Sequence, residues 1–174
     1  MTKFEELCAA YKKAQSEFKQ YKDDCHDFAA DLWNKVALYF QIPTSQLTLY
    51  NIDEEGEYLA TAPPIINALS LWPDAYWQIG FGITLFEKKD TYPQETIIIG
   101  LRLKRDLENN YFVRLNGSDQ EFQIDRKSET DFNKFFDYLF KEVQKSYSTG
   151  LQTFIDQDTT FRKIGFKLNQ EPEL

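Results

Sequence analysis

The stretch SLWPDAYWQIGFGITLFEKK, residues 70–89, decides how the middle of this chain folds. Interpreted as one continuous strand, residues 76–86 alternate apolar side chains onto one face and place Gly80 and Gly82 on the other. Interpreted as a hairpin, the same glycines form the tip, and the residues on either side of them return next to each other. The two interpretations imply different functions.

The stretch also contains Pro73-Asp74, followed thirteen residues after that Asp by Glu87-x-Lys89. This order resembles the short signature of the P-D-(D/E)-x-K nucleases, and the resemblance covers these residues alone. It implies a divalent metal, usually Mg²⁺, that is bound by Asp74 and Glu87, while Lys89 orients the attacking water. A metal-dependent nuclease is therefore the alternative function.

A continuous strand accounts for more of the stretch than a hairpin tip does. In a hairpin, Phe81 would be exposed at the apex, where polar turn residues are favoured. In a continuous strand, thirteen steps of about 3.3 Å separate Asp74 from Glu87 by roughly 40 Å, so the two cannot share a metal. We therefore predict a strand, no metal site and no cofactor.

The composition indicates a folded, acidic chain. Of its 174 residues 42% are hydrophobic and 16% aromatic, whereas disordered chains are poor in such residues. The formal net charge of -8 repels nucleic acid, so we expect no nucleic-acid binding. The first residues lack the apolar core of a signal peptide, and no run of about 18 apolar residues predicts a membrane span. Cys8 and Cys25 share one predicted helix and lie roughly 25 Å apart along it, beyond disulfide reach, which favours a reduced, cytoplasmic protein.

Residues 2–40 are predicted to form one long helix that opens with the capping box Thr2-x-x-Glu5. An apolar stripe with alternating spacings of three and four residues runs along it, which is typical of a coiled coil. Its N-terminal members are Phe4, Leu7, Tyr11, Phe18 and Tyr21. Such a stripe either pairs with a second copy, giving a homodimer, or packs against the chain's own sheet, and both interpretations remain open.

The remaining segments predict an α+β fold. Residues 46–124 show strand patterns joined by short connections, which indicates an antiparallel sheet of about five to six strands. Residues 128–157 form a helical region that begins with an amphipathic C-terminal helix, and residues 158–174 hold a weak strand and a tail. Because no linker interrupts the chain, we predict a single domain over residues 1–174.

The glycine-bearing face of the predicted sheet suggests a docking site. Pairing with the next strand would bring Gly100 near Gly82, on a surface bordered by basic and aromatic side chains. The predicted site consists of Gly80, Gly82, Gly100, Arg102, Lys104, Phe112 and Arg114.

Bare backbone permits close approach of a partner, and guanidinium groups pair with carboxylates bidentately. We therefore expect a non-enzymatic interaction or regulatory protein that docks an acidic peptide or anionic ligand on this face. Two other interpretations stay open, in which a helix packs over the glycines or the glycines simply allow the sheet to bend.

Overall fold

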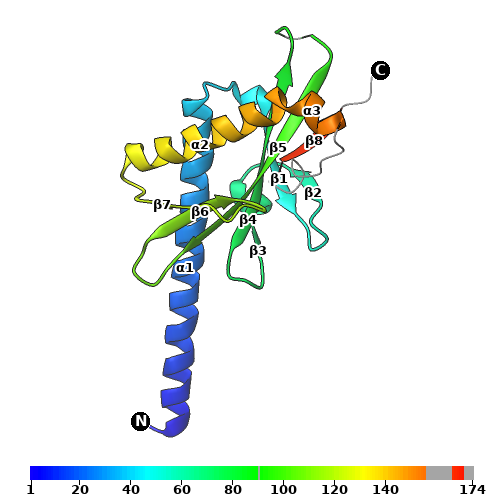
Figure 1. Cartoon of the computed structure of the whole chain (residues 1–174). Helices are drawn as coiled ribbons and strands as arrows, with labels where there is room; N and C mark the ends of the chain where they lie inside the picture. The colour runs from blue at the N-terminus through cyan, green and yellow to red at the C-terminus, as the bar shows by residue number, and fades with distance from the viewer. Residues whose placement is uncertain (90, 156–165, 171–174) are drawn as a thin grey trace.

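The computed structural model describes residues 1–89, 91–155 and 166–170. A long N-terminal helix, an antiparallel sheet and a second long helix make up the molecule (Figure 1), which confirms the predicted α+β class. Within the described ranges, no helix has both the length and the apolar character that crossing a membrane requires.

The first helix, α1 (Lys3–Tyr39), begins as its sequence predicts. The Thr2 hydroxyl accepts a hydrogen bond from the Glu5 backbone N–H at 3.2 Å, and the Glu5 carboxylate accepts one from the Thr2 N–H at 2.6 Å. These reciprocal bonds form the predicted capping box and satisfy two N–H groups that would otherwise lack partners. The helix ends just before Pro43, a residue that cannot continue it.

The sheet is antiparallel in every strand pair that the structure describes. Its strands are β1 (Leu47–Ile52), β2 (Tyr58–Thr61), β3 (Ser70–Leu71), β4 (Trp77–Phe86), β5 (Gln94–Arg105), β6 (Tyr111–Leu115), β7 (Glu121–Ile124) and β8 (Phe166–Gln170). The order across the sheet is β2-β1-β4-β5-β6-β7, while β3 pairs with β4 and β8 pairs with β5. The connections include two short 3-10 turns, η1 (Thr44–Gln46) and η2 (Ile65–Ala68).

The deciding stretch forms one continuous strand. β4 pairs with β5 along its whole length, from Trp77 opposite Leu103 to Phe86 opposite Gln94. The hairpin alternative is therefore wrong, since the glycines lie in the middle of the strand. We expected strand pairing to bring Gly100 near Gly82. The register instead places Gly100 opposite Gly80, and Gly82 opposite Ile98.

The hydrophobic core lies between this sheet and two helices. The C-terminal half of α1 and the helix α2 (Glu129–Ser148) both pack on the face that carries Ile79, Phe81 and Leu101. The buried helix residues are Cys25, Phe28, Ala29, Leu32 and Val36 from α1 and Phe132, Phe135, Phe136 and Leu139 from α2. The Ser128 hydroxyl caps α2 by accepting from the Asp131 N–H at 3.2 Å, and the short helix α3 (Gly150–Ile155) follows.

The sheet and the helices packed on it, with α1 from Tyr21 onward, form what we call the body. The N-terminal half of α1 extends away from it. Every residue from 1 to 20 is exposed, and Figure 1 shows this half of the helix (dark blue) projecting well past the sheet. We call residues 3–20 the arm. The interpretation in which the stripe packs against the chain's own sheet is confirmed for its C-terminal half, whereas the N-terminal half is exposed and packs on none of the described strands or other helices.

Candidate functional site

The arm presents a row of large apolar side chains to solvent. Phe4 is 73% exposed, Leu7 69%, Tyr11 68% and Phe18 53%. At about 100° of rotation per residue, these side chains point in the same direction as the buried α1 residues to within about 30°. The open row is therefore a direct continuation of the buried stripe, and an exposed apolar patch of this kind is a candidate interaction surface.

Tyr21 marks the boundary between the arm and the body. Its hydroxyl donates to the Ala75 carbonyl at 3.2 Å, and the Arg105 guanidinium lies 5.4 Å from its ring centre. Burial raises the pKa of Tyr21 to about 12. Tyr21, which we expected in the dimer stripe, is thus engaged by its own body, and the open row ends at Phe18.

The glycine face of the sheet is occupied by two tyrosines from the hairpin of β1 and β2. A Cβ atom placed on Gly80 would lie 2.8 Å from Cβ of Tyr50 and 3.0 Å from Cδ1 of Tyr58. A Cβ on Gly82 would overlap the Tyr50 ring, and one on Gly100 would overlap the Tyr58 hydroxyl. The three glycines therefore make room for tyrosine side chains. Neither a helix packed over the glycines nor an open backbone surface, the two possibilities considered from the sequence, is found in the described part of the chain.

The basic side chains of the predicted site do come together, around a residue that sequence reasoning missed. Tyr76, just before β4, has its ring centre 4.9 Å from Cζ of Arg102, 4.6 Å from Nζ of Lys104 and 4.5 Å from Cζ of Arg114. Phe112 lies under the same ammonium group of Lys104 at 5.4 Å. An aromatic ring attracts cations over its face, so Tyr76 holds the three together.

Two carboxylates oppose these cations. Asp74 forms an ion pair with Arg102, and Glu121 lies 3.8 Å from Nζ of Lys104 and accepts a hydrogen bond from the Tyr76 hydroxyl at 2.5 Å. We call Tyr76, Arg102, Lys104 and Arg114, with these two acids, the cationic cluster.

The cationic cluster is partly buried and carries more positive than negative charge. Burial lowers the pKa of Arg102, and the neighbouring charge of Arg114 lowers it further. The Nε atoms of Arg102 and Arg114 are both buried without a hydrogen-bond partner. Three cations face two carboxylates, so the cluster keeps an excess of positive charge.

The residues of the nuclease alternative lie apart. Asp74 precedes the ten-residue strand β4, and Glu87 and Lys89 follow it, exposed, at the other end. Among residues 1–89, 91–155 and 166–170, no three acidic, His or Cys side chains gather into a group that could bind a metal ion. The geometry that the resemblance requires is absent from these residues.

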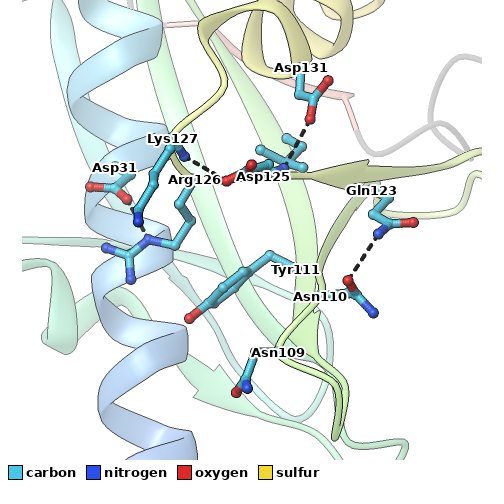
Figure 2. Close-up of a pocket in the computed structure, with 10 residues that line it drawn as sticks. Asp31, Asn109, Asn110, Tyr111, Gln123, Asp125, Arg126, Lys127 and Asp131 are labelled. Carbon is cyan, nitrogen blue, oxygen red and sulfur yellow. Dashed lines mark hydrogen bonds and ion pairs between the residues drawn. The ribbon is translucent and has the colours of Figure 1, made fainter.

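A polar cleft of about 940 Å³ opens where α1, the turn between β5 and β6, β7 and the start of α2 meet (Figure 2). Arg126 donates from Nε to Asp31 at 2.6 Å, and its guanidinium lies 5.4 Å from the Tyr111 ring centre. Across the cleft, Gln123 donates to Asn110 at 3.1 Å. No sequence motif identifies these residues, because they come from four separate segments.

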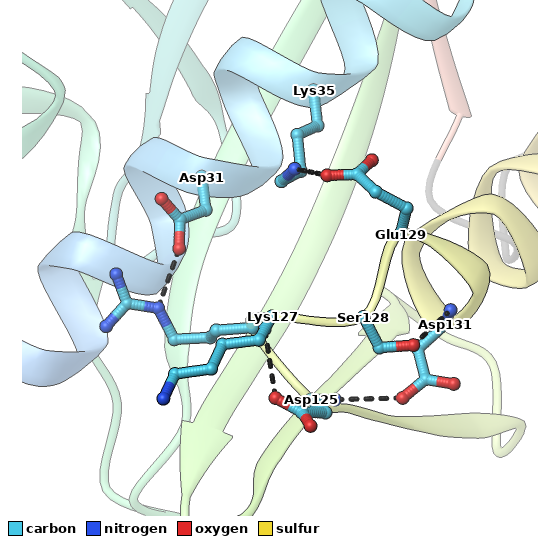
Figure 3. Close-up of polar contacts among 8 residues, drawn as sticks. Asp31, Lys35, Asp125, Lys127, Ser128, Glu129 and Asp131 are labelled. Atoms are coloured by element: carbon cyan, nitrogen blue, oxygen red, sulfur yellow. Dashed lines mark hydrogen bonds and ion pairs between the residues drawn. The ribbon is translucent and has the colours of Figure 1, made fainter.

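The same cleft holds the two helices in register. Asp31 pairs with Arg126 in the turn before α2 (Figure 2), and Lys35 pairs with Glu129 at the first residue of α2 (Figure 3), so consecutive turns of α1 are tied to α2 and to the turn that precedes it. Asp131 accepts from the Asp125 N–H at 3.0 Å and fixes the turn between them. Asp31 and Arg126 pair with each other, and Asp125 and Asp131 accept hydrogen bonds from backbone N–H groups, which indicates that these charged groups of the cleft have a structural role.

Comparison with known proteins adds no assignment, since no protein family, curated protein or solved structure matches the chain. Function must therefore be inferred from the arm and from the cationic cluster.

Proposed function

We propose that this chain is a non-enzymatic interaction protein that self-associates through its arm. The observation that carries the proposal is the exposed apolar row from Phe4 to Phe18. At about 200 Å² for each of its four large side chains, their exposed fractions correspond to about 500 Å² of apolar surface per chain. This area lies in the upper part of the range of about 300–600 Å² for the largest apolar patch on a soluble monomer, and such patches are often functional.

The helical state of the arm supports the same proposal. Isolated helices shorter than about 12–15 residues are marginal in water, and most helices in proteins are stabilised by packing of an apolar face. The arm has no such packing within the described residues, although its cap and its continuity with the buried half of α1 favour a helix. Contact with another apolar helix would supply the missing stabilisation.

Sedimentation of matched variants tests this proposal. Phe18→Glu places a charge within the apolar surface, at the end of the open row, so it should convert an assembled species into a monomer at micromolar to millimolar concentrations. The melting temperature of the body should stay unchanged, because Phe18 precedes the first residue that contacts the body. Ser16→Glu adds the same charge on the outer face of the arm and should sediment as the wild type does. A wild type that remains monomeric throughout would refute self-association.

A second candidate function, recognition of an acidic peptide or anionic ligand, is favoured by the excess positive charge of the cationic cluster, in which three cations face two carboxylates. Since tyrosines fill the glycine face, such a ligand would contact the exposed edge of Arg102, Lys104 and Arg114 instead of the backbone. It would compete with Asp74 for Arg102, so its binding should be moderate and salt-dependent.

A labelled hexaglutamate peptide provides the probe for this second candidate. Arg114→Gln should weaken its binding, whereas Asp74→Asn should strengthen it by releasing Arg102. Lys134→Gln removes the same charge from the exposed side of α2 and provides the control. Equal losses for Arg114→Gln and Lys134→Gln would show non-specific attraction and remove this candidate.

A further inference from the structure

We infer that two copies of the chain pair through their arms in antiparallel orientation, an inference that rests on the proposed self-association. The first reason is that the open row and the body lie on the same face of α1. Tyr21 touches the body only three residues after Phe18, which is about 4.5 Å further along the helix axis. A partner helix that packs on the open row must therefore end near Tyr21, because the body occupies the same face of α1 from that residue onward.

A parallel pair cannot meet this condition. Side by side and in register, the two helices would run on past Tyr21, and each would enter the space that the other chain's body occupies. Both bodies face the open row, so both would need the volume between the helices. A parallel pair would gain an attraction between Glu17 of one copy and Lys22 of the other, but an exposed pair of this kind is weak and does not offset the overlap.

An antiparallel pair avoids the overlap and fills the row. When Leu7 faces Phe18 of the second copy, Tyr11 faces the small Ala14, and Phe4 faces Tyr21 at the edge of the body. In the heptad, Phe4, Tyr11 and Phe18 occupy a positions and Leu7, Ala14 and Tyr21 occupy d positions. Each pair therefore places an a residue of one copy against a d residue of the other, as in antiparallel coiled coils. The body of the second copy then begins level with Phe4, so only the first three residues of each chain extend past its edge.

The size of this contact suits a dimer. The row from Phe4 to Phe18 is about 21 Å long, and the two rows together would remove about 1,000 Å² of apolar side-chain surface from water. Specific interfaces begin near this size. Because the same patch is used on both copies, the contact has two-fold symmetry and closes at two chains.

Disulfide trapping tests the orientation. The exposed Cys8 is first changed to Ser, and the buried Cys25 is kept. In this background Leu7→Cys together with Phe18→Cys should give a covalent dimer on oxidation. Leu7→Cys alone should not, because the two Leu7 positions are eleven residues, or about 16 Å, apart along the axis, far beyond disulfide reach.

The outcomes separate this inference from the proposed function. Cross-linking by Leu7→Cys alone would show a parallel pair and overturn the inference while supporting self-association. A monomeric wild type would overturn both.

Small-angle X-ray scattering of the wild type provides a check without cysteines. In the antiparallel pair the two Tyr21 residues lie about 25 Å apart along the axis, so the distance distribution should show two separated bodies. A single compact maximum for a dimeric wild type would contradict the antiparallel arrangement.

Discussion

Replacing Gly82 by alanine tests whether the tyrosine side chains fill the space over the glycines or whether that space is open. The added Cβ would overlap Cε2 of Tyr50 and would lie 3.3 Å from the Thr48 carbonyl oxygen. Neither neighbour can retreat freely, because Tyr50 is only 9% exposed and Thr48 pairs with residue 82 across the strands. Gly82→Ala should therefore overpack this face.

The magnitude follows from two opposing effects. Overpacking costs about 1–3 kcal/mol, while alanine in place of glycine within a strand recovers about 0.5–1 kcal/mol of backbone entropy. The free energy of unfolding should thus fall by about 1 kcal/mol, within a range of about 0–2.5 kcal/mol. In a chain of this size each kcal/mol lowers the melting temperature by about 2–4 °C.

A double-mutant cycle with Tyr50 assigns that loss to the contact. Tyr50→Ala alone should destabilise the protein, since it removes a buried ring. In the Tyr50→Ala background, Gly82→Ala should be neutral or stabilising by up to about 1 kcal/mol, because the overlap is gone. Tyr50→Phe keeps the ring and should leave the cost of Gly82→Ala unchanged.

The reasoning fails if Gly82→Ala stabilises the wild type by about 0.5–1 kcal/mol, which is the gain expected from backbone entropy without any overlap. It also fails if its cost persists after Tyr50→Ala. In either case the tyrosine would not fill the space over Gly82, and that part of the face would be open to a ligand.

Further expectations concern the boundary residue, the cleft and the metal alternative. The pKa of Tyr21 is raised by burial to about 12 against about 10 in an unfolded chain, so stability should be complete below pH 10 and fall as the pH rises towards 12. In alkaline absorbance titrations, Tyr21→Phe should remove one late-ionising phenol, whereas Tyr11→Phe in the arm should retain it. Arg126→Ala should lower the free energy of unfolding by about 1 kcal/mol, and a cycle with Asp31→Ala should show coupling between the two, whereas strict additivity would deny their ion pair. Titration with Mg²⁺ should leave the melting temperature unchanged, and DNA cleavage abolished by Asp74→Ala would contradict the position of that residue beside Arg102.

The sequence by itself determined those features whose signals act over a few residues. Thr2 with Glu5 and Ser128 with Asp131 mark the starts of the two long helices, because a cap is a hydrogen bond between residues three apart. The alternation through β4 predicted a continuous strand, since the side chains of a strand point to opposite faces in turn. The same rule placed Arg102 and Lys104 on one face of β5, as the shared contact with Tyr76 confirms.

Only the tertiary structure decided which surface each of these faces meets. The apolar stripe of α1 looks uniform in sequence, yet the body covers it only from Tyr21 onward, because the sheet reaches no further along the helix. Tyr58 fills the space over Gly100 from a separate strand, and no local pattern joins two residues so far apart. Caps and periodicity fix the direction in which a side chain points, whereas its partner depends on strand order, register and the curvature of the whole sheet.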